Sequence, residues 1–217
     1  MRSVQGTIED ALTRICGSEV ALTVAGRTDA GVHALGQVAS HPGPPAPAYA
    51  LNGILPHDVR VLASDPAPDG FDARRDALSR TYRYRLFTRS TLSPFERGRA
   101  LHWPHPLDRE ALDRCADAIR GTHDFTAFTP TQTDHVRFER DVLRAEWIAA
   151  DGPALELWIE GDTFMRHMVR TLVGTMLDVS RGRMHSADFE ALLLGAPRDQ
   201  AGDTAAAHGL YLQSVRY

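Results

Sequence analysis

The sequence predicts an α+β protein with two sheet-bearing halves, in which mainly antiparallel strands form a central sheet flanked by helices. Helix and strand patterns alternate, and several strand patterns follow one another directly, which favours this class over a doubly wound parallel sheet. The length of 217 residues allows one or two domains. A break in the pattern at 65–70 marks a candidate boundary and predicts subdomains 1–75 and 76–217.

The first half is predicted to contain short helices and strands. Residues 3–16 carry apolar side chains at helical spacing, and Gly17 can end that helix. Val20, Leu22 and Val24 alternate with polar or small residues, as in a strand. The elements that follow are a glycine-bracketed loop at 26–31, a strand at 35–40, a proline-rich loop at 41–47, a helix at 48–55 and a strand at 59–64.

The second half contains longer patterns. Residues 81–88 alternate with period two, which places the tyrosines on one face of a strand and the arginines on the other. Residues 163–180 form the strongest helix pattern, with Arg166 and Arg170 one turn apart on its polar side. The remaining predicted elements are strands at 100–103, 142–149, 154–160 and 209–217, and helices at 107–119 and 186–194, the last capped by Ser186.

The composition excludes several classes of protein. No stretch reaches the ~18–20 apolar residues of a membrane helix, and acids near the N-terminus argue against a signal peptide. Two cysteines are too few for a disulfide scaffold and fit a reducing compartment. All 24 basic residues are arginine, so neither a P-loop lysine nor a Schiff-base lysine is available. We expect a cytoplasmic protein with no membrane segment and no metal site.

One basic stretch stands out in a chain whose net charge is −4. Residues 71–99 contain eight arginines and three acids, an excess of five positive charges. Such a patch can bind phosphates even when the whole chain is acidic. A solvated strand face is the alternative explanation, and the sequence leaves both open.

The clearest chemical signal lies at 25–34, which read A-G-R-T-D-A-G-V-H-A. Small residues around Asp29 let a ligand approach the backbone closely, although a plain turn with an Asx-type bond is the alternative. Nine consecutive residues match the active-site signature G-R-T-D-A-G-V-H-A, so this segment resembles the tRNA pseudouridine synthase A family.

The resemblance extends over nearly the whole chain. Similar motifs are L-N-G-I-L-P at 51–56, F-D-A-R at 71–74, R-T-Y-R-Y at 80–84, G-T-H-D-F at 121–125, Phe164 with M-V-R at 168–170, and G-L-Y-L at 209–212. Two departures are clear. The family's opening strand, with its Y-D-G-x-x-F-x-G-W-Q-x-Q motif, is absent, and we expect a misplaced start codon or a shortened chain as the reason. Ala206 stands where the family usually has proline.

The resemblance implies roles for individual residues. Asp29 would be the catalytic carboxylate, which attacks C1′ or C6 of the nucleotide or takes a ribose proton. Arg170 would point at Asp29 and keep it charged. Tyr82 would contact the target uracil and help to remove its C5 proton, although a core-facing aromatic is the alternative. The residues expected to bind substrate are Arg27, Thr28, Arg74, Arg80 and Tyr82.

The resemblance also implies a function. It predicts a pseudouridine-synthase fold with its active-site cleft between the two halves, and an isomerase that converts uridine to pseudouridine without a cofactor. The substrate would be tRNA, at positions 38, 39 and 40 of the anticodon arm, bound by a homodimer. Two alternatives stay open: an RNA-binding relic of the same fold that lost catalysis with its first strand, and an Asp-dependent glycosidase, which would need a second carboxylate.

Overall fold

The computed structural model describes residues 2–217, in which the chain forms five α-helices and nine β-strands. These elements belong to two units, each with its own core. The first unit comprises the described residues up to Arg27 together with Gln37–Ala77. The second comprises Thr28–Gly36 and Leu78–Tyr217. The short segment Thr28–Gly36 therefore belongs with the long C-terminal part of the chain.

Two helices and a small antiparallel sheet form the first unit. Its elements are α1 (Val4–Cys16), β1 (Thr23–Val24), β3 (Ala39–Ser40) and α2 (Ala48–Ile54). The hydroxyl of Ser3 caps α1 by accepting a hydrogen bond from the Gly6 N–H at 3.1 Å. Gly17 ends α1 in the left-handed conformation, with φ 75°. Both helices predicted for this half are confirmed.

The strands beside the glycine-rich loop are only two residues long, so their predictions are only partly confirmed. In the stretch 20–24, Val20 and Leu22 are buried in the core that the two helices form, and only β1 pairs with another strand. Of the strand predicted at 35–40, only the last two residues form a strand, β3. Strand β2 (His33–Ala34) ends just before the predicted range. Apolar alternation here reflects burial more than strand pairing.

The strand predicted at 59–64 is wrong. The side-chain amide of Asn52 bonds to both backbone groups of Val61, accepting from its N–H at 2.9 Å and donating to its carbonyl oxygen at 2.8 Å. A side chain therefore satisfies the backbone that a neighbouring strand would otherwise pair with.

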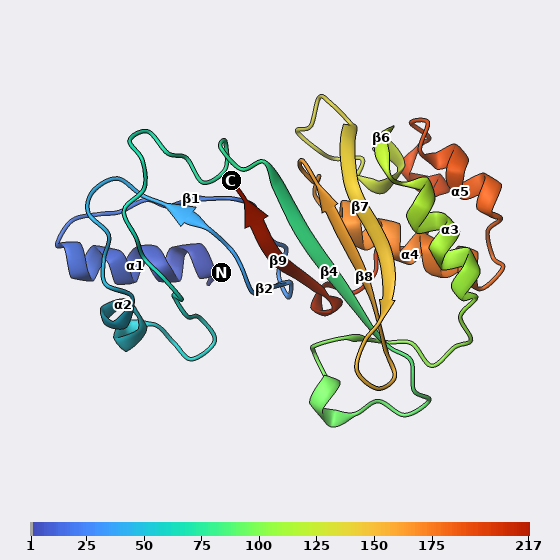
Figure 1. Cartoon of the computed structure of the whole chain (residues 1–217), viewed down its shortest axis with the longest axis horizontal. Helices are drawn as coiled ribbons and strands as arrows, with labels where there is room; N and C mark the ends of the chain where they lie inside the picture. Colours follow the sequence, from blue (N-terminus) through green and yellow to red (C-terminus); the bar gives the residue numbers. More distant parts are fainter. Residues whose placement is uncertain (1) are drawn as a thin grey trace. The chain divides into compact units, whose positions relative to one another are not determined.

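A large mixed sheet forms the centre of the second unit (Figure 1). Its strands follow in the order β2, β9 (Leu210–Arg216), β4 (Ser79–Phe87), β8 (Ala154–Gly161), β7 (Glu139–Ala149) and β6 (Gly121–Asp124), and β5 (Leu101–His102) also pairs with β4. The β2–β9 and β4–β5 pairs are parallel and the other pairs are antiparallel. The predicted α+β class with a mainly antiparallel sheet is confirmed, whereas β6 was not predicted.

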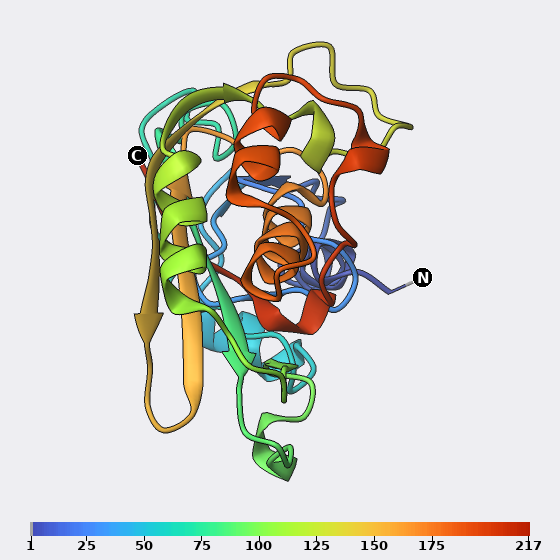
Figure 2. The same cartoon turned by 90° about the vertical axis from the view of Figure 1, so that its right-hand side faces the viewer.

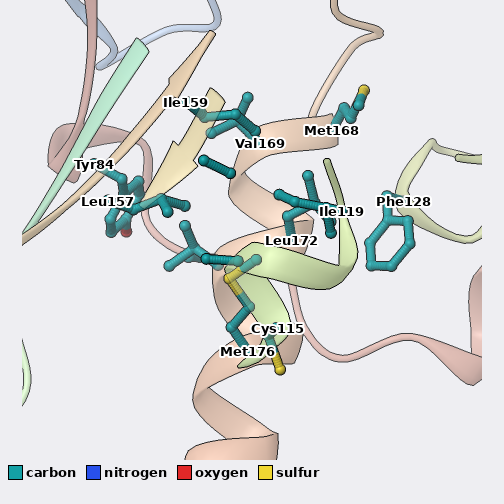
Figure 3. Close-up of a cluster of buried hydrophobic side chains, with 14 of the residues drawn as sticks. Tyr84, Cys115, Ile119, Phe128, Leu157, Ile159, Met168, Val169, Leu172 and Met176 are labelled. Atoms are coloured by element: carbon teal, nitrogen blue, oxygen red, sulfur yellow. The ribbon is translucent and has the colours of Figure 1, made fainter. Parts of the chain in front are cut away.

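Helices cover one face of this sheet (Figures 1 and 2). They are α3 (Arg109–Ala118), α4 (Met168–Ser180) and α5 (Ser186–Leu192). The short 3-10 helices of this unit are Pro94–Glu96, Thr126–Phe128, Arg198–Gln200 and Ala207–Gly209. Figure 3 shows Tyr84 and Leu157 of the sheet beside Leu172 and Met176 of α4. Within residues 2–217, no helix is both long and apolar enough to cross a membrane.

Helix α4 begins later than the sequence predicts. The pattern at 163–180 includes the buried Met165, but the helix starts only at Met168, after a β-turn closed by the Met168 N–H and the Met165 carbonyl oxygen at 3.2 Å. Arg166 is exposed and lies in this turn, so the expected pairing of Arg166 and Arg170 on one helix face is wrong. A buried turn residue continued the apolar spacing beyond the true start of the helix.

The cap predicted for α5 is also wrong by one residue. His185 occupies the N-cap position and Ser186 is the first helical residue. The carboxylate of Asp188 accepts a hydrogen bond from the His185 backbone N–H at 3.4 Å, so an acid in the first turn stabilises this helix end. The helix ends at Leu192, two residues earlier than predicted.

Gly174 lets the chain pass very close to α4. A methyl group at this position would overlap the backbone carbonyl oxygen of Asp203. The neighbouring Ala205 N–H donates to the Arg170 carbonyl oxygen at 3.1 Å, so the segment 203–205 lies directly against the helix. Only glycine leaves room for this approach.

The substitution Gly174→Ala should destabilise the protein by about 1–3 kcal/mol, because the backbone at 203–205 must shift away from the helix. Thermal melting measures the effect. Gly53→Ala is the matched control: it also lies in a helix, its added methyl meets open space, and it should stabilise the helix by up to about 1 kcal/mol. Equal melting temperatures for the two variants would contradict the close approach.

Candidate active site

The residues that follow Asp29 in the glycine-rich loop pair with the large sheet. In strand β2, His33 pairs with Tyr211 and Ala34 with Leu212, and the Leu35 N–H donates to the Leu212 carbonyl oxygen at 2.8 Å. The Asp29 carbonyl oxygen accepts from the Val32 N–H at 3.1 Å, which closes a turn. The loop thereby fixes the backbone from which the Asp29 side chain projects.

The structure brings Asp29 and Arg170 together. A guanidinium Nη1 of Arg170 lies 2.8 Å from Oδ2 of Asp29, and the Nε of the same guanidinium donates to the Ala205 carbonyl oxygen at 2.8 Å. The side chains are 14% and 25% exposed, so this ion pair is partly shielded from water. Two anchored edges of the guanidinium fix its plane, and its bond to the carboxylate is charge-assisted.

His167 is a third member of this group, and the sequence reasoning missed it. Its Nε2 lies 3.5 Å from the same Oδ2 of Asp29. Burial lowers the pKa of His167 most strongly; nearby arginines lower it further and Asp29 opposes them. The only signal in the sequence was its place directly before the M-V-R motif, which alone does not distinguish a ligand from a turn residue.

Tyr82 projects from β4 into the core of the second unit. It is 8% exposed, and its ring makes an edge-to-face contact with Phe164 at 5.2 Å between centroids. Burial raises the pKa of Tyr82 to about 12; Arg80 lowers it and Asp29 raises it further. The phenol therefore stays protonated near neutral pH and can donate a hydrogen bond, which makes it a poor base there.

The residues expected to bind substrate are placed unequally. Arg27 and Arg74 are exposed side chains of the first unit, and Thr28 is exposed in the loop that carries Asp29. Arg80 is only 6% exposed and donates to the Asp162 carbonyl oxygen at 2.8 Å. Its burial does not favour a direct contact with a phosphate.

The basic stretch divides into an inner and an outer set. On β4, Arg83 and Arg85 pair with Glu156 at 3.3 and 2.8 Å, and Arg85 also pairs with Glu96. These arginines stabilise the sheet face, and because they are already paired with carboxylates they are poorly suited to bind a phosphate. The five exposed arginines are Arg74, Arg75, Arg89, Arg97 and Arg99. Of these, the last three belong to one connection, from the end of β4 to β5.

Metal-binding groups are not part of this arrangement. Among the residues that the structure describes, no three His, Cys, Asp or Glu side chains lie together in a way that could hold a metal ion. The candidate site therefore consists of a carboxylate, a guanidinium, an imidazole and a phenol, which together can hold a negative charge and donate hydrogen bonds.

Comparison with known proteins places this chain in a family. Residues 115–217 match a family model described as tRNA pseudouridine synthase. Proteins named tRNA pseudouridine synthase A from Bacillus pumilus and Roseiflexus sp. are 38% and 43% identical, and the alignments cover all of this chain and 90% and 82% of the relatives. One of the same name from Thermus thermophilus is 41% identical over all of this chain and 88% of its own length.

The chain thus falls in the class of pseudouridine synthases, which the relatives show and to which the family model points. Its full-length similarity to the named relatives is more specific: the chain belongs to the tRNA pseudouridine synthase A family.

Proposed function

We propose that this chain converts uridine to pseudouridine in the anticodon arm of tRNA, at positions 38, 39 and 40, with Asp29 as its catalytic carboxylate. Membership of the family supports the reaction and the tRNA substrate. The observation that carries the role of Asp29 is its bond to Arg170 at 2.8 Å, on a loop of the family's signature sequence.

The reaction is an isomerisation in which atoms and electrons balance within one nucleotide. The N1–C1′ bond breaks, a C1′–C5 bond forms, and the proton on C5 is lost while N1 gains one. A charged carboxylate can assist by attacking C1′ or C6, or by taking a proton from the ribose. Arg170 orients the Asp29 carboxylate in each of these routes.

The target base must leave its stack before any of these steps. Extruding a base costs a few kcal/mol and needs a pocket that holds the flipped base. Tyr82, whose hydroxyl stays protonated, would contact that base as a hydrogen-bond donor or by stacking. Arg27 and Thr28, both exposed beside Asp29, would contact the neighbouring backbone.

The assembly and location of the enzyme are part of the same proposal. The protein would act in the cytoplasm as a homodimer, with one tRNA contacting both subunits. Light scattering of the free protein and of its tRNA complex tests the stoichiometry. A monomer in both samples would contradict the homodimer and would leave the assignment of Asp29 untouched.

Release of tritium from tRNA labelled with 5-³H-uridine tests the function, because formation of the C1′–C5 bond displaces the C5 hydrogen, whereas cleavage of the N1–C1′ bond alone does not. We expect release from a tRNA with uridine at positions 38, 39 or 40, and none when cytidine replaces all three. Binding of tRNA without release would support the RNA-binding relic. Free uracil as product would support a glycosidase.

The exposed arginines of the connection between β4 and β5 should contact tRNA phosphates. Replacing Arg89, Arg97 and Arg99 with glutamine should weaken tRNA binding and reduce the slope of log K against log salt by about 0.7–0.9 for each phosphate that is no longer neutralised. Arg114→Gln is the control, since Arg114 is an exposed arginine of α3. A slope that stays unchanged in the triple variant would show that this loop faces away from the RNA.

A further inference from the structure

We infer that His167 is a positioning residue for Asp29: its imidazole and the Arg170 guanidinium hold one carboxylate oxygen, Oδ2, and leave Oδ1 to face the substrate. This inference rests on the proposed function, because it assigns a task to the carboxylate that performs the reaction. It adds a residue to the site that the motifs of the sequence did not single out.

Both partners of the carboxylate approach the same atom. Arg170 Nη1 lies 2.8 Å and His167 Nε2 lies 3.5 Å from Oδ2 of Asp29. Across residues 2–217, every hydrogen bond and ion pair of this carboxylate goes to Oδ2. A carboxylate held at one oxygen by two groups cannot rotate freely, so the second oxygen keeps a fixed direction.

The backbone at His167 is unusual in a way that serves this contact. With φ 64° and ψ −9°, it is the one residue other than glycine with positive φ in the described part of the chain. It occupies the third position of the turn from Met165 to Met168, where this conformation ordinarily requires glycine. Histidine is tolerated there at a cost, and such strain is found mainly where a side chain has a task.

The turn also sets the spacing of the two partners. It ends directly at α4, so His167 is the N-cap and Arg170 is the third residue of the helix, and both side chains reach Oδ2 of Asp29. Met168 between them is fully buried in the core beside Val169 (Figure 3). The buried residues anchor the helix start, and the two polar residues meet Asp29.

Burial and the neighbouring arginines lower the pKa of His167, which favours a neutral ring at pH 7, and Asp29 opposes them. The groups acting on it are Asp29, Arg170, Arg166 and Arg198, and burial is the largest influence. A neutral imidazole with its proton on Nε2 donates to Oδ2 without neutralising the carboxylate. The 3.5 Å separation exceeds an ordinary hydrogen bond, as contacts of catalytic groups often do before the substrate binds.

Replacing His167 with glycine separates the effect of the backbone conformation from the effect of the imidazole. His167→Gly keeps the positive φ without strain and removes the ring, so its melting temperature should stay within a few degrees of the wild type. Its single-turnover rate on tRNA should fall roughly ten- to hundred-fold, as when an orienting partner of an active-site ligand is removed. Its affinity for tRNA should stay unchanged, because the ring orients a carboxylate rather than binding RNA.

Added imidazole gives a second readout that a purely structural role would not move. The side chain of His167 is 26% exposed, so free imidazole can enter the space left in His167→Gly and should restore part of the rate. It should not restore Asp29→Ala and should not change the wild type. Partial rescue confined to the glycine variant is the expected result.

Full activity of His167→Gly, with a wild-type rate and no response to imidazole, would overturn the inference and leave His167 as a turn residue only. Failure of the proposed function looks different, since the wild type itself would then release no tritium from tRNA. His167→Ala checks the strain: it should melt below His167→Gly, because positive φ is unfavourable for alanine, while losing the same activity.

Discussion

Replacing Asp29 with asparagine should lower the rate of pseudouridine formation by about 10⁴-fold or more, because the amide can neither attack the nucleotide nor accept a proton as a carboxylate does. The shape of the side chain is retained and its amide oxygen can still accept from Arg170, so the fold should persist. Affinity for tRNA should stay within about three-fold, since one carboxylate contributes little to phosphate recognition. Single-turnover tritium release and a binding titration measure the two effects.

The control for this variant is Asp151→Asn, which changes an exposed aspartate in the turn between β7 and β8. It should leave both rate and affinity unaltered. Measurable turnover by Asp29→Asn at a tenth of the wild-type rate would remove Asp29 from its catalytic role.

Arg170 should be nearly as important for the rate, and its two bonds explain why lysine cannot replace it. The guanidinium donates from Nη1 to Asp29 and from Nε to the Ala205 carbonyl oxygen, whereas a single ammonium cannot reproduce this fixed fork. We expect Arg170→Lys to lose most of its turnover while remaining folded. Arg170→Met should lose nearly all turnover, because the carboxylate then loses the guanidinium that orients it.

Folding must be measured together with these rates. Breaking a fully buried pair costs ~3–5 kcal/mol, and the partial exposure of Asp29 reduces that cost here. Arg183→Met removes an exposed arginine that lies 3.6 Å from Asp178, and it should leave both melting and turnover nearly unchanged. A folded Arg170→Met with wild-type turnover would contradict the assignment of this pair.

The long strands of the second unit could be predicted because their pattern has a physical cause. In β4, Tyr84 and Leu86 are fully buried while Arg83 and Arg85 lie on the other face, as period-two alternation requires. The two-residue β5 falls within the strand predicted at 100–103, but the bounds of β1, β2 and β3 could not be predicted, because tertiary contacts decide how far such short segments pair. The start of α4 was misplaced because the buried Met165 continues the helical apolar spacing through a turn.

From the sequence, only those members of the candidate site that lie in a family motif could be predicted. The signature loop and the M-V-R motif single out Asp29 and Arg170, which the structure brings to 2.8 Å. The contact of His167 depends on a backbone conformation that histidine seldom adopts, and no local pattern indicates it. The burial of Arg80 was equally hidden, since a charged residue on a strand predicts exposure unless its partners are known.

The assignment of Thr28–Gly36 to the second unit has a consequence for how this gene can be divided. The chain leaves the first unit after Arg27, returns to it at Gln37 and leaves it again after Ala77. A gene cut between codons 77 and 78 would therefore encode Arg170 and Tyr82 on one polypeptide and Asp29 on the other. The polypeptide with Arg170 would also lack β2, which leaves the edge of β9 unpaired. If the two units are expressed separately or exchanged between proteins, the segment Thr28–Gly36 must therefore stay with the C-terminal part. It would have to be joined to that part by circular permutation or by insertion.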